Sequence, residues 1–341
     1  MAQRAKKSRK VRWGILGVAK IATVKVIPAM QKGKHSIVTA IASRSLAKAK
    51  KAAKALGIPK AYGSYEELLR DPDIDAVYNP LPNHLHVPLS VAAAAAGKHV
   101  LCEKPLALDA TEARKLLDAR DQHGVLVQEA VMVKTHPQWL GARDLMRKGK
   151  IGKPRAVMGF FSYFNRDPKN VRNIAGIGGG GLLDIGFYPI TTSRFFFGEE
   201  PTRVMGIVEM DPDMKVDRLA SAILDFPTGQ AIFTCGTQLV SYQRMHFFGT
   251  KGRIEIEIPF NAPRDRPCRI FLDNGSDLHG KKGIKTISFP TCDQYTIQGD
   301  LFSKAILDGK PAPIPLEDAV QTMAVIDAIF RSSASGQWEK P

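Results

Sequence analysis

The sequence VRWGILGVAKIA at residues 11–22 contains the signals for a strand, a tight turn and the start of a helix. It matches the dinucleotide-binding pattern G-x-G-x-x-G in part, because Gly17 is present while Ala19 and Ala22 replace the other two glycines. Small residues at a helix start allow a pyrophosphate to approach the backbone N–H groups. An ordinary tight turn between a strand and a helix would show the same pattern. The residues predicted to contact the dinucleotide here are Gly17, Ala19, Lys20 and Ile21.

The second predicted strand, Ser36–Ala42, is followed by Ser43 and Arg44 instead of an acidic residue. Enzymes that select NAD usually place Asp or Glu at this point, where it binds the ribose 2′-hydroxyl. A hydroxyl and a planar cation instead suit a 2′-phosphate. We therefore expect Ser43, Arg44 and the nearby Lys48 to bind NADP(H), with NAD as the alternative cofactor. The alternative interpretation of Arg44 is a surface arginine at a strand end.

Strand and helix patterns alternate as far as residue 129 and predict a doubly wound parallel sheet, because parallel strands need helical crossovers. Successive β-type runs with turns between them then predict an open-faced, mostly antiparallel sheet. The expected fold class is therefore an α/β Rossmann domain plus an α+β sheet domain. The predicted parts are a basic flexible tail at 1–10, an NADP-binding Rossmann domain at 11–129, and a sheet domain at 130–341.

Two stretches lie at the carboxyl ends of predicted strands, where ligands bind in an open α/β sheet. The first, at residues 79–86, contains two prolines, which exclude a helix and a central strand. Its residues predicted to face the cofactor are Pro80, Asn83 and His86. Neighbouring backbone groups would satisfy His86 equally well.

The second stretch is Glu103 and Lys104, followed by Pro105. A lysine at the carboxyl end of a strand is well placed to face a nicotinamide ring, so we expect both Glu103 and Lys104 at the cofactor. A surface Glu–Lys pair that ends the strand is the alternative.

The stretch GGGGLLDIGFY at Gly178–Tyr188 begins with four glycines, which interrupt regular structure before a predicted helix. Asp184 and Tyr188 are four residues apart, a spacing that places both polar groups on one helix face. Burying a carboxylate and a phenol in an apolar helix start is costly unless they have a purpose. We expect both to meet the hydroxyls of a substrate, together with Lys104. In the alternative, Asp184 favours the helix dipole and Tyr188 packs.

Composition bounds the class of protein. The 341 residues carry a net charge of +16, and the basic residues are dispersed apart from the N-terminal ten residues and one helix. This favours an anionic small ligand over nucleic acid. The four cysteines form no C-x-x-C pair, which argues against a zinc site or a disulfide scaffold and fits a reducing cytoplasm. No apolar run approaches the length of a membrane helix and no secretory signal is visible. We expect a cytoplasmic protein with no metal.

Several motifs in one order make the chain similar to the glucose–fructose oxidoreductase and inositol dehydrogenase family, Gfo/Idh/MocA. They are GKHVLCEKP at 97–105, GGGGLLDIGFYPI at 178–190, the loop at 83–86 and IPLEDAVQTMAVIDAIF at 314–330. Asp184 with Tyr188, EAVMVKTHPQ at 129–138 and DPKNVR at 167–172 resemble the branch with glucose–fructose oxidoreductase, D-xylose dehydrogenase and dimeric dihydrodiol dehydrogenase. Lys134 and Thr135 depart from the aromatic residue and the arginine expected there.

The resemblance implies an NAD(P)-dependent alcohol–carbonyl reaction on sugars or polyols, with homodimers or homotetramers formed through the sheet. Tyr188 is then the expected general acid/base, and Lys104 is expected to stabilise its phenolate and lower its pKa from about 10. Asp184 is expected to accept hydrogen bonds from sugar hydroxyls. Arg172 is a second expected substrate contact, with a structural ion pair as the alternative.

The leading hypothesis is an NADP-dependent aldose 1-dehydrogenase of the D-xylose or D-glucose type. The alternatives are a reductase of anhydro- or keto-sugars, a trans-dihydrodiol dehydrogenase, and a non-catalytic NADP-binding regulator. Nucleic-acid binding through the basic tail is the weakest alternative.

Overall fold

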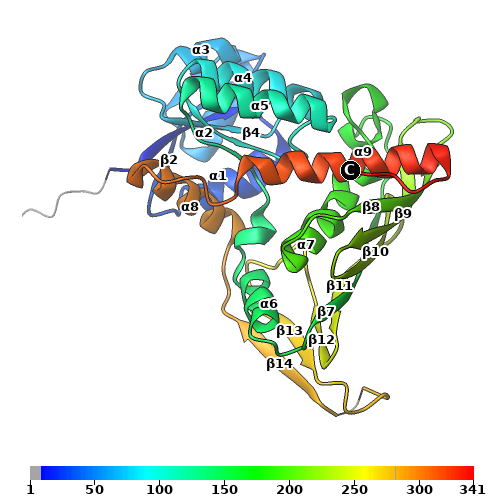
Figure 1. The fold of residues 1–341 in the computed structure, drawn as a ribbon. Coiled ribbons are helices and arrows are strands. Elements are labelled where there is room, and N and C mark those ends of the chain that lie inside the picture. Colours follow the sequence, from blue (N-terminus) through cyan, green and yellow to red (C-terminus); the bar gives the residue numbers. More distant parts are fainter. Residues whose placement is uncertain (1–8, 281) are drawn as a thin grey trace, which may run out of the picture.

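The structure is a computed structural model, and it describes residues 9–280 and 282–341. Within that part of the chain, one sheet has six parallel strands in the order β3-β2-β1-β4-β5-β6, and a second has eight strands in the order β14-β13-β12-β11-β7-β10-β9-β8. Only β7 and β10 are parallel neighbours in the second sheet, as far as the described residues show. The predicted Rossmann domain and mostly antiparallel sheet are therefore confirmed (Figure 1).

The first domain alternates short strands with helices, whose ends have the expected caps. Side chains of Ser45, Ser64 and Asp109 accept N–H groups at the starts of three helices, and glycines in the left-handed conformation end two of them. The strands are β1 (Val11–Leu16), β2 (Ser36–Ala42), β3 (Lys60–Tyr62), β4 (Ala76–Asn79), β5 (His99–Cys102) and β6 (Val127–Glu129). The helices and single turns are η1 (Ala22–Val26), α1 (Ile27–Met30), α2 (Leu46–Leu56), α3 (Tyr65–Arg70), η2 (Asn83–Leu85), α4 (His86–Ala95) and α5 (Ala110–His123). The three-residue edge strand β3 has no counterpart in the sequence prediction.

The second domain packs helices against one face of its sheet. Its strands are β7 (Pro154–Phe164), β8 (Arg203–Met210), β9 (Asp217–Phe226), β10 (Gly229–Gly236), β11 (Gln238–Gly249), β12 (Gly252–Ile256), β13 (Cys268–Asp273) and β14 (Ile284–Phe289). Its helices and turns are η3 (Met132–Thr135), α6 (Pro137–Arg147), η4 (Val171–Asn173), η5 (Ala175–Ile177), η6 (Leu182–Gly186) and α7 (Phe187–Phe197). Helices α8 (Gln294–Asp308) and α9 (Leu316–Ser335) follow the last strand.

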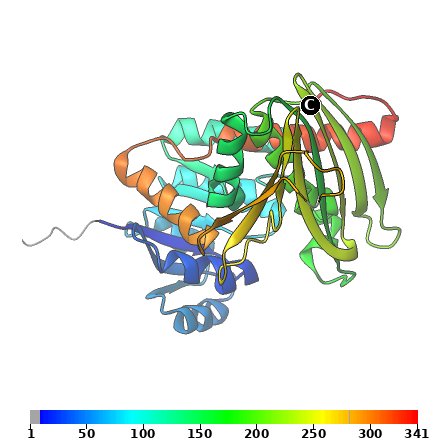
Figure 2. The same ribbon diagram turned by 90° about the horizontal axis from the view of Figure 1, so that it is seen from below.

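The two C-terminal helices return to the first domain (Figures 1 and 2). Trp13 of β1 donates to the Ser303 hydroxyl of α8 at 3.0 Å and lies against Phe302, with ring centroids 5.8 Å apart. Asp300 of α8 accepts the N–H groups of Lys34 and His35. Helix α9 packs on both α5 and β8. Helix α8, which follows the last strand of the second sheet, therefore packs against β1 and the Lys34–His35 segment of the first domain.

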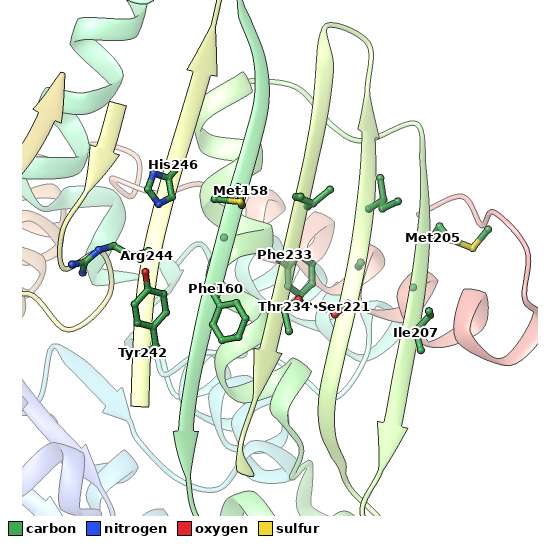
Figure 3. A pocket seen from close by; sticks show the side chains of 15 residues that line it. Met158, Phe160, Met205, Ile207, Ser221, Phe233, Thr234, Tyr242, Arg244 and His246 are labelled. Carbon is green, nitrogen blue, oxygen red and sulfur yellow. Dashed lines mark hydrogen bonds between the residues drawn. The ribbon is translucent and has the colours of Figure 1, made fainter. Parts of the chain in front are cut away.

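Alternation along β7 gives the second sheet two different faces. Val157 and Phe161 are buried on the side of α7, whereas Met158 and Phe160 lie on the opposite face. That opposite face carries a hollow of about 500 Å³, lined mainly by apolar side chains of β7 to β11 (Figure 3). Large apolar side chains are exposed around it; Ile207, for example, is 75% exposed.

Residues 1–8 of the predicted basic tail lie outside the described residues. Arg9 pairs with Asp75 at 3.3 Å, and Lys10 donates to the carbonyl of Gly33 at 2.9 Å. No helix in 9–280 or 282–341 combines the length and the hydropathy needed to cross a bilayer.

Candidate active site

The turn after β1 admits only glycine at residue 17. Gly17 has φ +98°, and a Cβ atom there would lie 2.6 Å from Cδ2 of Leu81. The next helix starts at Lys20, so the N–H groups of Ala19, Lys20 and Ile21 lie at its N-terminus, where the preceding chain supplies no helical acceptors. A close backbone turn at a helix start fits the diphosphate of a dinucleotide.

The end of β2, beside β1, carries the polar residues predicted to bind a 2′-phosphate. Ser43 is half-buried, and its hydroxyl accepts the N–H of Ser45 at 3.3 Å. Arg44 and Lys48 are exposed. Arg44 interacts with the hydroxyl of Tyr65, which also lies 3.9 Å from the Cβ position of Gly17. Tyr65 was not predicted at the site, and its place at the start of α3 gave no signal for it.

The loop after β4 is fastened to other parts of the protein. Asn83 donates to the carbonyl of Gly178 at 2.7 Å, across the two domains. Gly178 has φ +82°, and a Cβ atom there would collide with Leu108 and Asn83. His86 is buried, with its ring nitrogens 2.7 Å from the carbonyls of Leu81 and Pro105. The observed contacts of His86 are those of the alternative interpretation, in which backbone groups satisfy the ring.

Burial lowers the pKa of His86 to about 4, although its two carbonyl contacts act in the opposite direction. Pro80 is buried beside this loop. The structure therefore gives Asn83 and His86 contacts within the protein, and their predicted contacts with a cofactor stay predictions.

Lys104 reaches from the end of β5 to the second domain. Its ammonium group donates to the Asp184 carbonyl at 2.6 Å and to Oδ1 of Asp184 at 3.0 Å. Glu103 does not pair with it; instead Glu103 accepts a hydrogen bond from Tyr78 at 2.5 Å and the N–H of Lys104 at 3.3 Å. The alternative of a surface Glu–Lys pair is therefore wrong.

Asp184 is held by three side chains. Lys104 binds Oδ1, while the Tyr163 hydroxyl and Nε of Arg172 both donate to Oδ2 at 2.7 Å. Burial alone would raise the pKa of Asp184, but the two cations and the phenol outweigh it, so the pKa lies well below its ordinary value. Asp184 is therefore ionised, and it fixes the positions of Lys104, Tyr163 and Arg172. Tyr163 was missed from the sequence, because an aromatic residue in the strand run FFSYF looks like a core residue.

Tyr188 lies beside this cluster and is only 7% exposed. Lys104 Nζ lies 4.9 Å from its ring centroid, and the phenol packs against Phe161, Phe187 and Phe260. The hydroxyl contacts Sδ of Met132 at 3.9 Å, a weak acceptor. Burial raises the pKa of Tyr188 well above its ordinary value. The expectation that Lys104 lowers this pKa is wrong, because Lys104 is paired with Asp184 and the ring is desolvated.

Asp184 and Tyr188 converge on Lys104 through an unusual turn. Residues Leu182–Gly186 form a π-helical turn before α7, so the predicted α-helical geometry between the two residues is wrong. The N–H of Leu182 at its start donates to Asp217 at 2.6 Å, which fixes the entry of the chain. Wider turns of this kind are frequent at functional sites.

Lys134 does not enter this cluster. It is buried and forms an ion pair with Asp318 of α9, and Asp318 also binds Arg194 of α7 at 3.1 Å. Through Asp318, Lys134 therefore connects η3 to α9 and α7.

The fold and the cluster define a class of protein: an oxidoreductase with a nicotinamide-dinucleotide-binding Rossmann domain and a separate sheet domain. Residues 11–131 match the model of an oxidoreductase family with an NAD-binding Rossmann fold, and residues 139–255 match the GFO/IDH/MocA C-terminal domain. The protein belongs to the GFO/IDH/MocA family of oxidoreductases, as the sequence motifs predicted.

Three similar proteins cover almost the whole chain. An uncharacterised oxidoreductase of Rhizobium meliloti is 50% identical over 96% of this chain and 98% of its own. D-xylose 1-dehydrogenase (NADP(+)) 2 of Haloferax volcanii is 36% identical over 95% of this chain and 98% of its own. A 3-ketoreductase of Actinomadura kijaniata, solved with NADP and TDP-benzene, is 30% identical with a TM-score of 0.88, over 95% of this chain and 98% of its own.

Proposed function

We propose that the protein transfers hydride between NADP(H) and a sugar or polyol carbon, as an aldose 1-dehydrogenase of the D-xylose or D-glucose type. The observation that carries the proposal is the convergence of Lys104, Asp184 and Tyr188 from two domains. The similarity to the xylose dehydrogenase of Haloferax volcanii supports the substrate class. The four unpaired cysteines support a reducing compartment such as the cytoplasm.

Different residues are assigned to cofactor binding, substrate binding and proton transfer. The nicotinamide, when bound, gives or takes the hydride. Gly17 and the helix start after it would hold the diphosphate, and Ser43 with Arg44 would hold the 2′-phosphate. Lys104 uses two N–H groups on Asp184, which leaves its third N–H for a substrate oxygen. Tyr188 exchanges the proton with that oxygen, while Asp184 and Arg172 hold Lys104 and the substrate in place.

A keto-sugar reductase is the second candidate, and the state of Tyr188 favours it. A phenol with a raised pKa is a proton donor at neutral pH, which suits the reduction of a carbonyl. The ketoreductase of Actinomadura kijaniata was also solved as variants of one lysine and one tyrosine. These two residues have the same separation along that chain as Lys104 and Tyr188 have here.

A panel of aldoses, anhydro-sugars, keto-sugars and dihydrodiols, assayed in both directions by nicotinamide absorbance, tests the proposal. Because Tyr188 must lose its proton to act as a base, oxidation should accelerate from pH 7 to pH 10, whereas reduction should change little below pH 9. Turnover of no panel member with either NADP or NAD would contradict the proposed function.

Cofactor preference gives a separate prediction. Arg44→Ala should raise KM for NADP by about 10-fold or more, while KM for NAD changes less than about two-fold, because a charge-assisted bond to the 2′-phosphate is lost. Initial rates with both cofactors measure the effect. Lys51→Ala, an exposed lysine of α2 away from the strand end, is the control. Equal losses for the two cofactors would refute the role of Arg44.

We further infer that the open face of the second sheet joins two copies of the chain. The hollow and the exposed Ile207, Ile232 and Tyr242 form an apolar surface larger than isolated exposed side chains explain (Figure 3). The mass in sedimentation equilibrium checks this inference; a monomer at micromolar concentration would contradict it.

A further inference from the structure

The turn that carries Lys104 is held by hydrogen bonds at three successive residues. Glu103 accepts the N–H of Lys104 at 3.3 Å, and His86 contacts the carbonyl of Pro105 at 2.7 Å. Glu129 accepts the N–H of Leu106 at 2.7 Å. Lys104 spans the gap between the domains, so a small rotation of this turn would move its ammonium group away from Asp184.

Glu129 approaches the turn from the neighbouring strand. In the parallel pair of β5 and β6, Glu129 lies opposite Cys102, the last residue before the turn. The N–H of Ala130 donates to the Cys102 carbonyl at 2.7 Å. The backbone beside Glu129 thus fixes the start of the turn, and its side chain fixes the end at Leu106.

The side chain of Glu129 is unusual in its burial. It is 1% exposed, and Oε2 is buried without a hydrogen-bond partner in residues 9–280 and 282–341. Glu129 forms no ion pair in that part of the chain, because the nearby Lys134 is paired with Asp318. Burial and the charge of Asp318 raise the pKa of Glu129. A buried carboxyl group costs free energy, and its one hydrogen bond goes to the turn.

We propose that Glu129 is a positioning residue for Lys104, because it holds Leu106 and thereby fixes the turn at 103–106. The proposal rests on the proposed function for its effect on turnover. The carboxyl group acts as a hydrogen-bond acceptor and not as a charge. Glu129 acts on the reaction only through the turn, so its loss affects kcat through the placement of Lys104.

Three substitutions of Glu129 distinguish the effects of losing its hydrogen-bond acceptor, its charge and its side-chain volume. Glu129→Gln keeps an acceptor for Leu106 and has no charge, so kcat should stay within about two-fold of the wild type. Glu129→Ala should lower kcat by about 10- to 100-fold, the scale of a misplacement near 1 Å, with KM for NADP nearly unchanged. Glu129→Leu fills the space without accepting a hydrogen bond, and it should match the alanine variant.

The control removes an equivalent hydrogen bond just beyond the turn. Glu112 accepts the N–H of Leu108 at 2.8 Å, so Glu112→Ala loses a similar bond on the same loop and should leave kcat unchanged. Hydrogen exchange at the Leu106 amide, measured by mass spectrometry with single-residue fragmentation, should be faster in Glu129→Ala and Glu129→Leu but not in Glu129→Gln.

Two results would overturn the proposal. The first is unaltered kcat and unaltered Leu106 exchange in the leucine variant. The second is an equal loss of kcat in the glutamine and leucine variants, which would assign the effect to the charge. If the wild type turns over no sugar, the proposed function fails by itself, and the exchange rates still decide whether Glu129 holds the turn.

Discussion

Tyr188→Phe should lower kcat for carbonyl reduction by about 10²- to 10⁴-fold, the range for loss of a general acid. The substitution removes one oxygen, whose contact in the protein is the weak one to Met132, so the aromatic packing is retained. NADPH binding, measured by nucleotide fluorescence, should be unchanged. Steady-state rates at pH 7 compare the variant with the wild type.

Tyr163→Phe is the matched control for this experiment. Both residues are phenols beside Asp184, but the Tyr163 hydroxyl donates to Asp184, whereas the Tyr188 hydroxyl contacts only the weak acceptor Met132 within the described residues. We expect the Tyr163 variant to lose no more than about 10-fold, since Lys104 and Arg172 still hold Asp184. A larger loss in the Tyr163 variant than in the Tyr188 variant would reverse the assignment of the acid.

Lys104→Met should lower kcat/KM for the sugar by about 10²-fold or more. The ammonium group gives two hydrogen bonds to Asp184 and has one N–H left for the substrate, so both the anchor and the electrostatic contact are lost. The loss should fall on both kcat and KM, because Asp184 is then held by Arg172 and Tyr163 only. Initial-rate kinetics on the best sugar of the panel measure it.

Lys98, a buried lysine, provides the control for Lys104. Lys98 also donates to backbone carbonyls, those of Asp71 and Ile74, but it precedes β5 and lies at the opposite end of that strand from Lys104. Lys98→Met should lower the melting temperature while kcat/KM stays within about two-fold. Equal kinetic losses in the two variants would mean that the effect of Lys104 is a general loss of stability.

Features with a local signal could be predicted from the sequence. Gly17, the prolines after β4 and the polar pair in an apolar helix start each break a regular pattern, and the structure places Asp184, Tyr188 and Lys104 together. The fold followed from the change of periodicity at residue 129.

Other features depend on contacts between distant residues and had no local signal. Tyr163 lies in an aromatic strand, where alternation indicates a face but not a partner. In the sequence, Glu129 only ends a strand, and its hydrogen bond to Leu106 is visible in the structure alone. The raised pKa of Tyr188 depends on the rings around it, so the sequence led to the opposite direction. The π-helical turn at Leu182–Gly186 begins at a hydrogen bond to Asp217, which lies far from it in the sequence.

Because α8 packs against the first domain, that domain is not complete as an N-terminal fragment. A fragment that stops near residue 130 would contain every strand of the parallel sheet, yet Trp13 would have no indole acceptor at Ser303 and no ring of Phe302 against it. Designs that transplant the nucleotide-binding half into a chimera therefore need the C-terminal helices of the same parent.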